Sequence, residues 1–364
     1  MSRQDVIARP TAGGKTDIGR EVSGVSGSTM VSIPHPSAAI GVPHSRFVTG
    51  LIWLVTLNVA SATALVSAAD RFWPGDMIAF FRPQFALAIL LLLSAALVLR
   101  RRTASAALAA LLAVNALPLF IIGVPTAIFA STPNLRIVSA NVLFDNATPE
   151  RFGKLITELS PDIIVVQEAR YDWPAVLKTT LPDFPNQVGQ EVLSWNGNLV
   201  LSRHPMHAKL VTDMPPSGNW LGGARALRVE VELPGRARPL VLYALHSPTP
   251  RSAAAWKARN RYLDVLAGRI AAEPDGTEIV LAGDWNTPVW SPAYGRTLFL
   301  SGLEATERSA WPHASRIFAS LGGVNAGTPI DHIAVSRGIG AVAFFTGPDF
   351  DSDHLPVVAD LKLP

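Results

Sequence analysis

Glu278–Asn286, with the sequence EIVLAGDWN, is an apolar run that ends abruptly in polar residues. Its residues Ile279 to Ala282 predict a buried strand, and the side chains of Asp284 and Asn286 follow where that strand ends. These two residues face the same side if the strand geometry continues, and Gly283 allows another backbone or a ligand to approach closely. The segment therefore predicts a carboxylate and an amide side by side at the edge of a sheet. Taken alone, it is equally typical of a strand that ends in a turn.

Other apolar segments carry polar residues of catalytic types at their ends. Strands are predicted over residues 135–140, 162–167 and 239–245, and they are followed by Asn141, Glu168 and His246, respectively. Further along, Asp331 opens an apolar segment, and Asp353 and His354 directly precede the last one. Each residue by itself is more often a capping or surface residue than a functional one. Their shared position at strand ends predicts that they converge on one pocket.

Strand and helix patterns alternate from about residue 132 to the C-terminus, which indicates an α/β fold. Further strands are predicted over residues 198–202, 226–231, 330–335, 341–345 and 355–361. Apolar residues at helical spacing predict one helix capped by Thr148 and Pro149 and a second helix over residues 252–272. These elements predict a single domain over residues 132–364.

The N-terminal region predicts a membrane anchor. Residues 1–45 are rich in Gly, Ser, Thr and Pro, which predicts a disordered cytoplasmic tail. Residues 46–131 then contain three long apolar stretches, at about residues 47–69, 80–99 and 104–130, which predict three transmembrane helices. The first stretch has 23 uncharged residues, and it spans about 34 Å as a helix, enough for a bilayer core. Buried core helices or a cleaved signal peptide fit this pattern less well.

Basic residues assign an orientation to these helices. Arg100, Arg101 and Arg102 lie between the second and third stretches, and the tail is also basic, so both are expected in the cytoplasm. After three spans, the domain lies outside the cytoplasm. The predicted location is therefore the inner or plasma membrane, as a multi-pass protein with a periplasmic or extracellular domain. If one of the three stretches does not cross the membrane, the domain is instead expected in the cytoplasm.

Charge and cysteine content exclude some kinds of site. The residues before Asn134 include 10 basic and 5 acidic side chains, whereas the rest of the chain has 21 basic and 23 acidic ones. The slightly acidic domain lacks the charge typical of a protein that holds long nucleic acids by their phosphates. The chain has no cysteine, which excludes disulfides, thiolate metal sites and a cysteine nucleophile.

The motifs carry a family resemblance. The segments SANV, QEAR, LHSP, GDWN, PIDHI and SDHLPV occur in this order. Together they resemble the metal-dependent endonuclease/exonuclease/phosphatase superfamily, and specifically a membrane-anchored bacterial branch of it. The resemblance covers residues 134–364. It implies a four-layer α/β/β/α sandwich of two mixed sheets, here preceded by three transmembrane helices, and an enzyme that hydrolyses phosphate esters.

The resemblance also implies a metal site. Glu168 resembles the principal metal-binding acid of the superfamily. Asn141 resembles the residue next to that acid at the metal or phosphate, and Asp353 resembles a residue that completes the metal shell. These oxygen ligands suit Mg²⁺, with Mn²⁺ as the alternative ion.

Five further residues resemble the catalytic group of the superfamily. Asp284 matches the carboxylate that activates or orients the attacking water, and Asn286 matches the amide that holds a phosphoryl oxygen or that water. His354 resembles the ring beside the scissile phosphate, with Asp331 as its carboxylate partner, and His246 the second histidine, which stabilises transition-state charge. The resemblance leaves open which residue is the formal base and which acid partners His246. We expect His332 to be structural, because it uses the strand face opposite to Asp331.

These observations predict a membrane-anchored, Mg²⁺-dependent hydrolase of phosphate esters. Its tether holds the site near lipid, which favours a lipid or lipid-linked phosphate as substrate, with the bilayer as a partner. The first alternative is an extracytoplasmic nuclease that acts on DNA or RNA, and the second is a non-catalytic, membrane-tethered binding module. The sequence leaves open the substrate, diester or monoester chemistry, and the oligomeric state.

Overall fold

The computed structural model describes residues 43–121, 132–189, 197–212, 214, 224–309, 311–321 and 324–364. The residues divide after His44 into two units, and the features below belong to the second unit, Ser45–Pro364. The predicted tail lies outside the described residues, apart from the start of the first helix. The end of the third predicted membrane stretch, from residue 122, also lies outside them.

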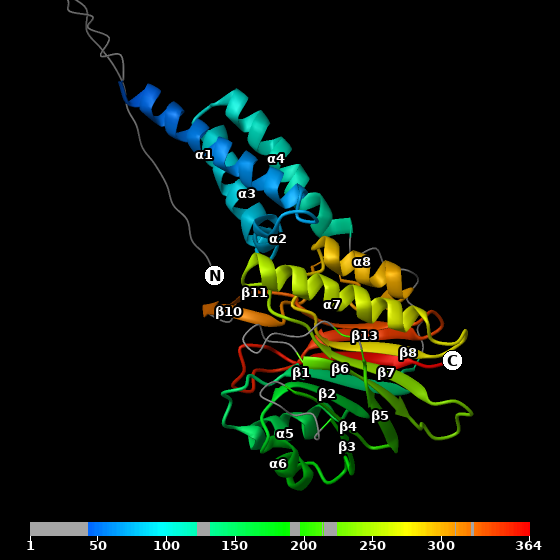
Figure 1. The fold of residues 1–364 in the computed structure, drawn as a ribbon. Helices are drawn as coiled ribbons and strands as arrows, with labels where there is room; N and C mark the ends of the chain where they lie inside the picture. The colour runs from blue at the N-terminus through cyan, green and yellow to red at the C-terminus, as the bar shows by residue number, and fades with distance from the viewer. Residues whose placement is uncertain are drawn as a thin grey trace, which may run out of the picture. The chain divides into compact units, whose positions relative to one another are not determined.

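Two six-stranded mixed sheets form the centre of the domain (Figure 1). The first sheet contains, in spatial order, β13 (Gly340–Thr346), β14 (Val357–Lys362), β1 (Leu135–Asn141), β2 (Ile163–Ala169), β4 (Gly197–Ser202) and β3 (Asn186–Val188). The second sheet contains β5 (Met206–Leu210), β6 (Ala224–Val231), β7 (Leu240–His246), β8 (Ile279–Asp284), β12 (Asp331–Val335) and β9 (Glu304–Ala305). The predicted fold class is confirmed.

Helices cover the outer faces of both sheets, which makes four layers (Figure 1). Helices α5 (Pro149–Leu159) and α6 (Trp173–Thr180) pack on the first sheet, where Phe152 and Trp173 join one apolar cluster with Ile164. Helices α7 (Ala253–Ala271) and α8 (Pro292–Ser301) pack on the second sheet. A third cluster fills the space between the sheets, with Val165 from one and Val280 from the other. The central strands are buried on both faces because each of these faces has an apolar neighbour.

The directions of the strands bring distant residues to one edge of the sandwich. β1 runs parallel to β2, and β7 runs parallel to β8, so that His246 is opposite Asp284. β12 is antiparallel to β8, which places its first residue, Asp331, opposite Asp284 as well. β14 is antiparallel to β1, so the residues just before β14 lie at the same edge as Asn141. Residues that begin antiparallel strands thus meet residues that end parallel ones.

The N-terminal part forms helices α1 (Pro43–Ser67), α2 (Trp73–Ala79), α3 (Arg82–Val98) and α4 (Arg102–Ile121). In the described part of the chain, the segments Arg46–Ser67 and Arg102–Phe120 are long and apolar enough to cross a membrane. α2 and α3 pass the same criteria only as a pair, bent by 76°. The described residues therefore provide two candidate spans, or three if the bent pair counts as one, which is compatible with membrane insertion.

Local structure differs from the sequence prediction in several places. A separate two-stranded hairpin, β10 (Arg316–Leu321) and β11 (Val324–Thr328), was not predicted, nor were α6 and α8. Thr148 precedes α5 but does not cap it by a side-chain hydrogen bond. Its hydroxyl group instead donates to Asn146 Oδ1 at 2.7 Å, because Asn146 forms a turn that competes for it. By contrast, Ser252 caps α7 by accepting from the backbone N–H of Ala255.

Candidate active site

Asn141 and Glu168 come from the first sheet, at the ends of neighbouring strands. Asn141 Nδ2 donates to Glu168 Oε1 at 2.9 Å and to Asp284 Oδ2, which belongs to the second sheet, at 3.2 Å. Glu168 lies in the left-handed region, with φ of 60°, and its Oε2 accepts from the Phe144 backbone N–H at 3.1 Å. Burial by itself raises the pKa of Glu168, but the charge of His246 and the donated hydrogen bonds hold this pKa below its usual value. The carboxylate is therefore ionised and fixed.

Asp284 is the central carboxylate of the candidate site. Its side chain is fully buried, and burial together with the charge of Asp331 raises the pKa of Asp284 to about 6, against the lowering effect of two histidines. Asp284 Oδ1 accepts from the Asn286 backbone N–H at 2.8 Å, and Oδ2 accepts from Asn286 Nδ2 at 3.2 Å. Such a pKa suits a group that accepts a proton near neutral pH.

The strand geometry, on which a shared face for Asp284 and Asn286 depended, does not continue to Asn286. β8 ends at Asp284, and Asn286 has a φ of 46°. The turn brings the two side chains together by hydrogen bonds instead of by strand alternation. Gly283 has a φ of 150°, and a Cβ there would lie 1.9 Å from Leu245 O. The close approach of β7 to β8 therefore requires glycine.

His246 lies between two carboxylates. Its Nε2 is 3.6 Å from Glu168 Oε1 and 3.6 Å from Asp284 Oδ2. Among the described residues, neither ring nitrogen of His246 has a hydrogen-bond partner, although the side chain is buried. Buried polar groups are normally paired, so these nitrogens are available to a bound molecule. The structure thus supplies the acidic neighbours that sequence reasoning did not assign.

His354 and Asp331 form a buried pair. His354 Nδ1 is 2.7 Å from Asp331 Oδ2, and neither side chain is more than 1% exposed. Burial lowers the pKa of His354, but the charge and hydrogen bond of Asp331 outweigh it and raise the pKa to about 9. Burial raises the pKa of Asp331, but the charge and hydrogen bond of His354 outweigh burial and hold the pKa of Asp331 below its usual value. The ring is thereby oriented with Nε2 directed away from Asp331.

Arg316, which sequence reasoning missed, contacts this histidine. Arg316 Nη1 is 2.9 Å from His354 Nε2, and Arg316 Nη2 is 2.5 Å from Asp353 Oδ2. A protonated His354 cannot accept from Arg316, because both groups would then be donors. Protonation of His354 would therefore break this contact, while Arg316 Nη2 stays paired with Asp353. No motif marks Arg316, which lies in the unpredicted hairpin β10–β11.

The donor set fits a divalent cation bound through oxygen atoms. Asp353 Oδ1 is buried without a hydrogen-bond partner in the described part of the chain. Asp284, Asp331 and His354 offer ligand atoms within 4.8 Å of one another. Carboxylate and amide oxygens are the ligands that Mg²⁺ prefers. The predicted ligands Asn141 and Glu168 are hydrogen-bonded to each other, and Asp353 is joined to His354 through Arg316.

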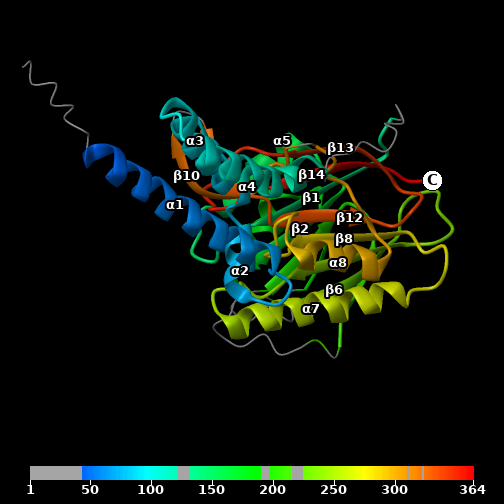
Figure 2. The ribbon, with the colours of Figure 1, turned by 90° about the horizontal axis from the view of Figure 1, so that it is seen from above.

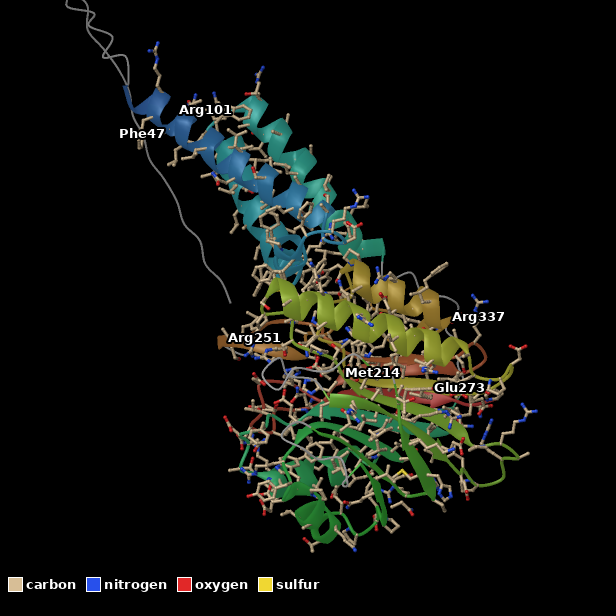
Figure 3. All side chains as sticks on the ribbon, viewed as in Figure 1. Phe47, Arg101, Met214, Arg251, Glu273 and Arg337 are labelled. Atoms are coloured by element: carbon tan, nitrogen blue, oxygen red, sulfur yellow. The ribbon has the colours of Figure 1, made fainter. Side chains whose placement is uncertain are left out.

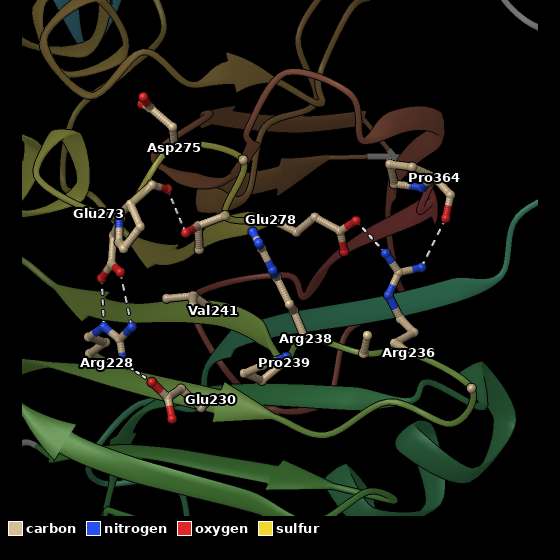
Figure 4. Close-up of a pocket in the computed structure, with 15 residues that line it drawn as sticks. Arg228, Glu230, Arg236, Arg238, Pro239, Val241, Glu273, Asp275, Glu278 and Pro364 are labelled. Carbon is tan, nitrogen blue, oxygen red and sulfur yellow. Dashed lines mark hydrogen bonds and ion pairs between the residues drawn. The ribbon is translucent and has the colours of Figure 1, made fainter.

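A hollow of about 710 Å³ lies elsewhere, at the opposite ends of β7 and β8 (Figure 4). Several of its charged residues pair with one another: Arg228 with Glu230 and Glu273, and Arg236 with Glu278. None of the predicted site residues lines it. We place the candidate site by its convergent polar groups and not by the size of this hollow.

His332 lies in the core beside Trp285, as expected for a structural residue. The His332 ring packs 5.3 Å from Trp285 and 4.7 Å from Tyr294, measured between ring centroids. His332 Nε2 is 2.7 Å from Thr287 O. Burial lowers the pKa of His332 to about 4, so the ring is neutral. It supports the loop after Asp284 without entering the site.

Comparisons with known proteins agree with this geometry. The sequence profile of the Endonuclease/Exonuclease/phosphatase family matches residues 138–354. A solved endonuclease/exonuclease/phosphatase from Beutenbergia cavernae is similar, with 24% identity and a TM-score of 0.51 over 64% of this chain and 72% of that one. A search of curated proteins finds no match.

Two further solved structures share the fold. A mannosyl-6-phosphatase from Bacteroides thetaiotaomicron has 15% identity and a TM-score of 0.51, over 63% of this chain and 100% of that one. The TDP2 protein of D. rerio, complexed with a single strand DNA product, has 15% identity and a TM-score of 0.51, over 63% of this chain and 98% of that one. At these identities, the likeness shows the fold alone.

Proposed function

The chain belongs to the endonuclease/exonuclease/phosphatase family and is a metal-dependent phosphoesterase. From this premise, we propose that it hydrolyses lipid or lipid-linked phosphate esters at a membrane surface, outside the cytoplasm. The observation that carries the proposal is the pair of hydrogen bonds that Asn141 donates, one to Glu168 and one to Asp284. It joins the strand ends of two sheets into one acidic site flanked by two buried histidines.

Asn141, Glu168 and Asp353 are the proposed ligands of Mg²⁺. Glu168 and Asp353 have side chains that are 21% and 32% exposed, whereas His246 and His354 are buried, so the opening of the site lies on the side of the two acids. The alternative ligand set includes a nitrogen atom of His354, which suits Mg²⁺ less well than oxygen does. When bound, the ion neutralises charge on the phosphoryl oxygens.

The proposed chemistry assigns one role to each side chain. Asp284, held by Asn286, accepts a proton from the attacking water. His354, oriented by Asp331, donates a hydrogen bond from Nε2 to the phosphoryl group. His246 stabilises the negative charge that develops in the transition state through its unpaired ring nitrogens.

A substrate at the membrane surface is supported by aromatic residues beside the site. Phe81 and Phe318 are each 46% exposed, and their ring centroids are 5.2 Å apart. Phe81 directly precedes the apolar helix α3, whereas Phe318 lies on the hairpin that carries Arg316 to His354. Exposed Phe rings can bury at the boundary between lipid head groups and acyl chains. The arrangement fits a phosphate head group at the site and an acyl or polyprenyl chain in the bilayer.

The substrate class is testable with the full-length protein in lipid nanodiscs. We expect polyprenyl phosphates or phospholipids to be hydrolysed in Mg²⁺ with a kcat/KM at least about tenfold above that for single-stranded DNA. A chelator should abolish turnover, and added Mg²⁺ or Mn²⁺ should restore it. Faster cleavage of DNA would favour the nuclease interpretation, and activity in the presence of chelator would contradict the metal assignment.

The proposed orientation is supported by the contacts of the helices. Phe47 and Arg101 lie at the same end of the helical bundle, away from α7 and α8 (Figure 3). At the other end, the Trp73 Nε1 group donates to Pro250 O of the domain at 2.8 Å. If the basic end faces the cytoplasm, the domain lies on the opposite side.

Reporter fusions test this orientation. An alkaline phosphatase fused after Pro364 should be active in a bacterial host, and a fluorescent protein at the same position should be dark. Fusions after Arg102 serve as the control and should give the reverse pattern, because that position is predicted to be cytoplasmic. A cytoplasmic pattern after Pro364 would contradict the proposed three spans.

A further inference from the structure

Asp76, which lies before the domain in helix α2, is buried against the domain. Its side chain is 1% exposed and forms an ion pair with Arg259 of α7, which is 0% exposed. Asp76 Oδ2 also accepts from Trp256 Nε1 at 3.0 Å, and Oδ1 accepts from Ser291 Oγ at 2.5 Å. Figure 2 shows α2 next to one end of α7 and α8. Two charges are rarely buried completely unless each is paired and hydrogen-bonded, as here.

Arg259 connects this ion pair to the loop that follows Asp284. One guanidinium nitrogen, Nη2, contacts Asp76, and the other, Nη1, donates to Asn286 O at 2.8 Å and to Thr287 Oγ1. Asn286 in turn donates its backbone N–H and its Nδ2 group to the Asp284 carboxylate. An unbroken chain of polar contacts therefore runs from α2 to the central carboxylate of the site.

We propose that Asp76 and Arg259 are positioning residues, through which the membrane-proximal helix α2 holds the Asp284–Thr287 loop in its active geometry. Asn286 has a φ of 46°, in a region that is unfavourable for residues other than glycine and asparagine. Because asparagine tolerates this region, the contacts of the loop with Arg259, and not backbone strain, are what hold its position. The planar fork of Arg259 suits this task, because it binds Asp76 on one side and Asn286 O on the other.

The inference rests on the proposed function but concerns residues outside it. Asp76 lies before residues 138–354, which match the family, so the family fold does not itself account for this contact. The same interface includes apolar packing, since Ala79 and Ala86 share a cluster with Tyr262 and Leu263 of α7. Apolar packing would join α2 to the domain without any charge. The buried ion pair adds a specific connection to the catalytic loop.

The test compares three variants of the full-length chain. Asp76→Asn removes the charge that holds Arg259, and Trp256→Phe removes one hydrogen bond to Asp76 while it keeps an aromatic ring. Trp73→Phe is the matched control, because it removes an indole hydrogen bond between α2 and the domain, to Pro250 O, without touching Asp76 or Arg259. Removal of one partner from a buried ion pair is strongly destabilising. Trp256→Phe therefore keeps the test decisive if Asp76→Asn does not fold.

Two measurements distinguish positioning from general stability. Amide hydrogen exchange should accelerate in the peptide that contains residues 284–289 in Asp76→Asn and Trp256→Phe, but not in Trp73→Phe. In turnover, kcat should fall about 10- to 100-fold in Asp76→Asn and about threefold in Trp256→Phe, with KM unchanged. Trp73→Phe should retain the wild-type kcat.

Each outcome bears on one proposal. Equal exchange of residues 284–289 in Trp256→Phe, Trp73→Phe and the wild type would overturn the positioning role, whatever the activity. Turnover that falls equally in Trp73→Phe would also overturn it, because general loosening of the interface would then explain the loss. A wild-type protein that hydrolyses no phosphate ester would refute the proposed function, while the exchange measurement would still decide the positioning role.

Discussion

Asp284→Asn is expected to lower kcat by about 10³-fold without unfolding the protein. Asparagine keeps the size of the side chain and an oxygen that can accept from the Asn286 backbone N–H. It cannot accept a proton from water. Steady-state kinetics with saturating Mg²⁺ would show the loss mainly in kcat, because the group acts in the chemical step.

The stability of this variant depends on two opposing effects. Burial raises the pKa of Asp284 to about 6, above its ordinary value of 3.8. A raised carboxyl pKa means that the folded state favours the protonated form of Asp284. At pH values above 6 the group is ionised, and it then destabilises the folded state relative to the unfolded state. In chelator at pH 8, removal of this charge offsets the loss of the hydrogen bonds that Oδ2 accepts from Asn141 and Asn286, so the Tm of Asp284→Asn should stay close to that of the wild type. Wild-type turnover, or a large fall in Tm that itself explains the loss, would contradict the assigned role.

Asp331→Asn is expected to lower kcat by about 10²- to 10³-fold at pH 8. The carboxylate raises the pKa of His354 to about 9, and without it burial and the charge of Arg316 lower this pKa, while Asp284 is left as the group that raises it. The ring is then less protonated at pH 8. In a pH profile of kcat/KM, the wild type should lose activity as the pH rises through about 9. The variant should lose it at a lower pH.

The same pair makes a prediction for stability. Because the pKa of His354 is raised on folding, its contribution to stability is fully present below pH 6.5 and is lost as the pH rises through about 9. Denaturant unfolding should show this loss in the wild type and not in Asp331→Asn. His313→Ala is the matched control, since His313 pairs with Glu307 at 2.7 Å outside the candidate site. Its activity should be normal, and a loss equal to that of Asp331→Asn would contradict a specific role for His354.

The family and the fold class were predictable because their signals are local in sequence. An apolar strand that ends in GDWN, and a buried strand preceded by SDH, appear within a few residues. Strand directions then bring these ends to one edge, and the Asn141–Asp284 hydrogen bond shows that the two sheets meet there. Apolar length alone also indicated helices compatible with a membrane.

The details of the turn after Asp284 were not predictable in the same way. Strand alternation was expected to place Asn286 beside Asp284, but a residue with positive φ does so. Similarly, the neighbours of His246 come from β2 and β8, which are distant in sequence. A periodic pattern describes regular backbone only, so it does not extend into a turn or across two sheets.

The sequence by itself determined which residue types stand at the strand ends, and hence the phosphoesterase family and the candidate catalytic groups. Only the tertiary structure decided that Arg316 touches His354 and that Asp76 pairs with Arg259, 183 residues away. The physical reason is that an isolated charge in a sequence carries no sign of its partner. Burial makes such a pair necessary, and burial is a property of the packed chain.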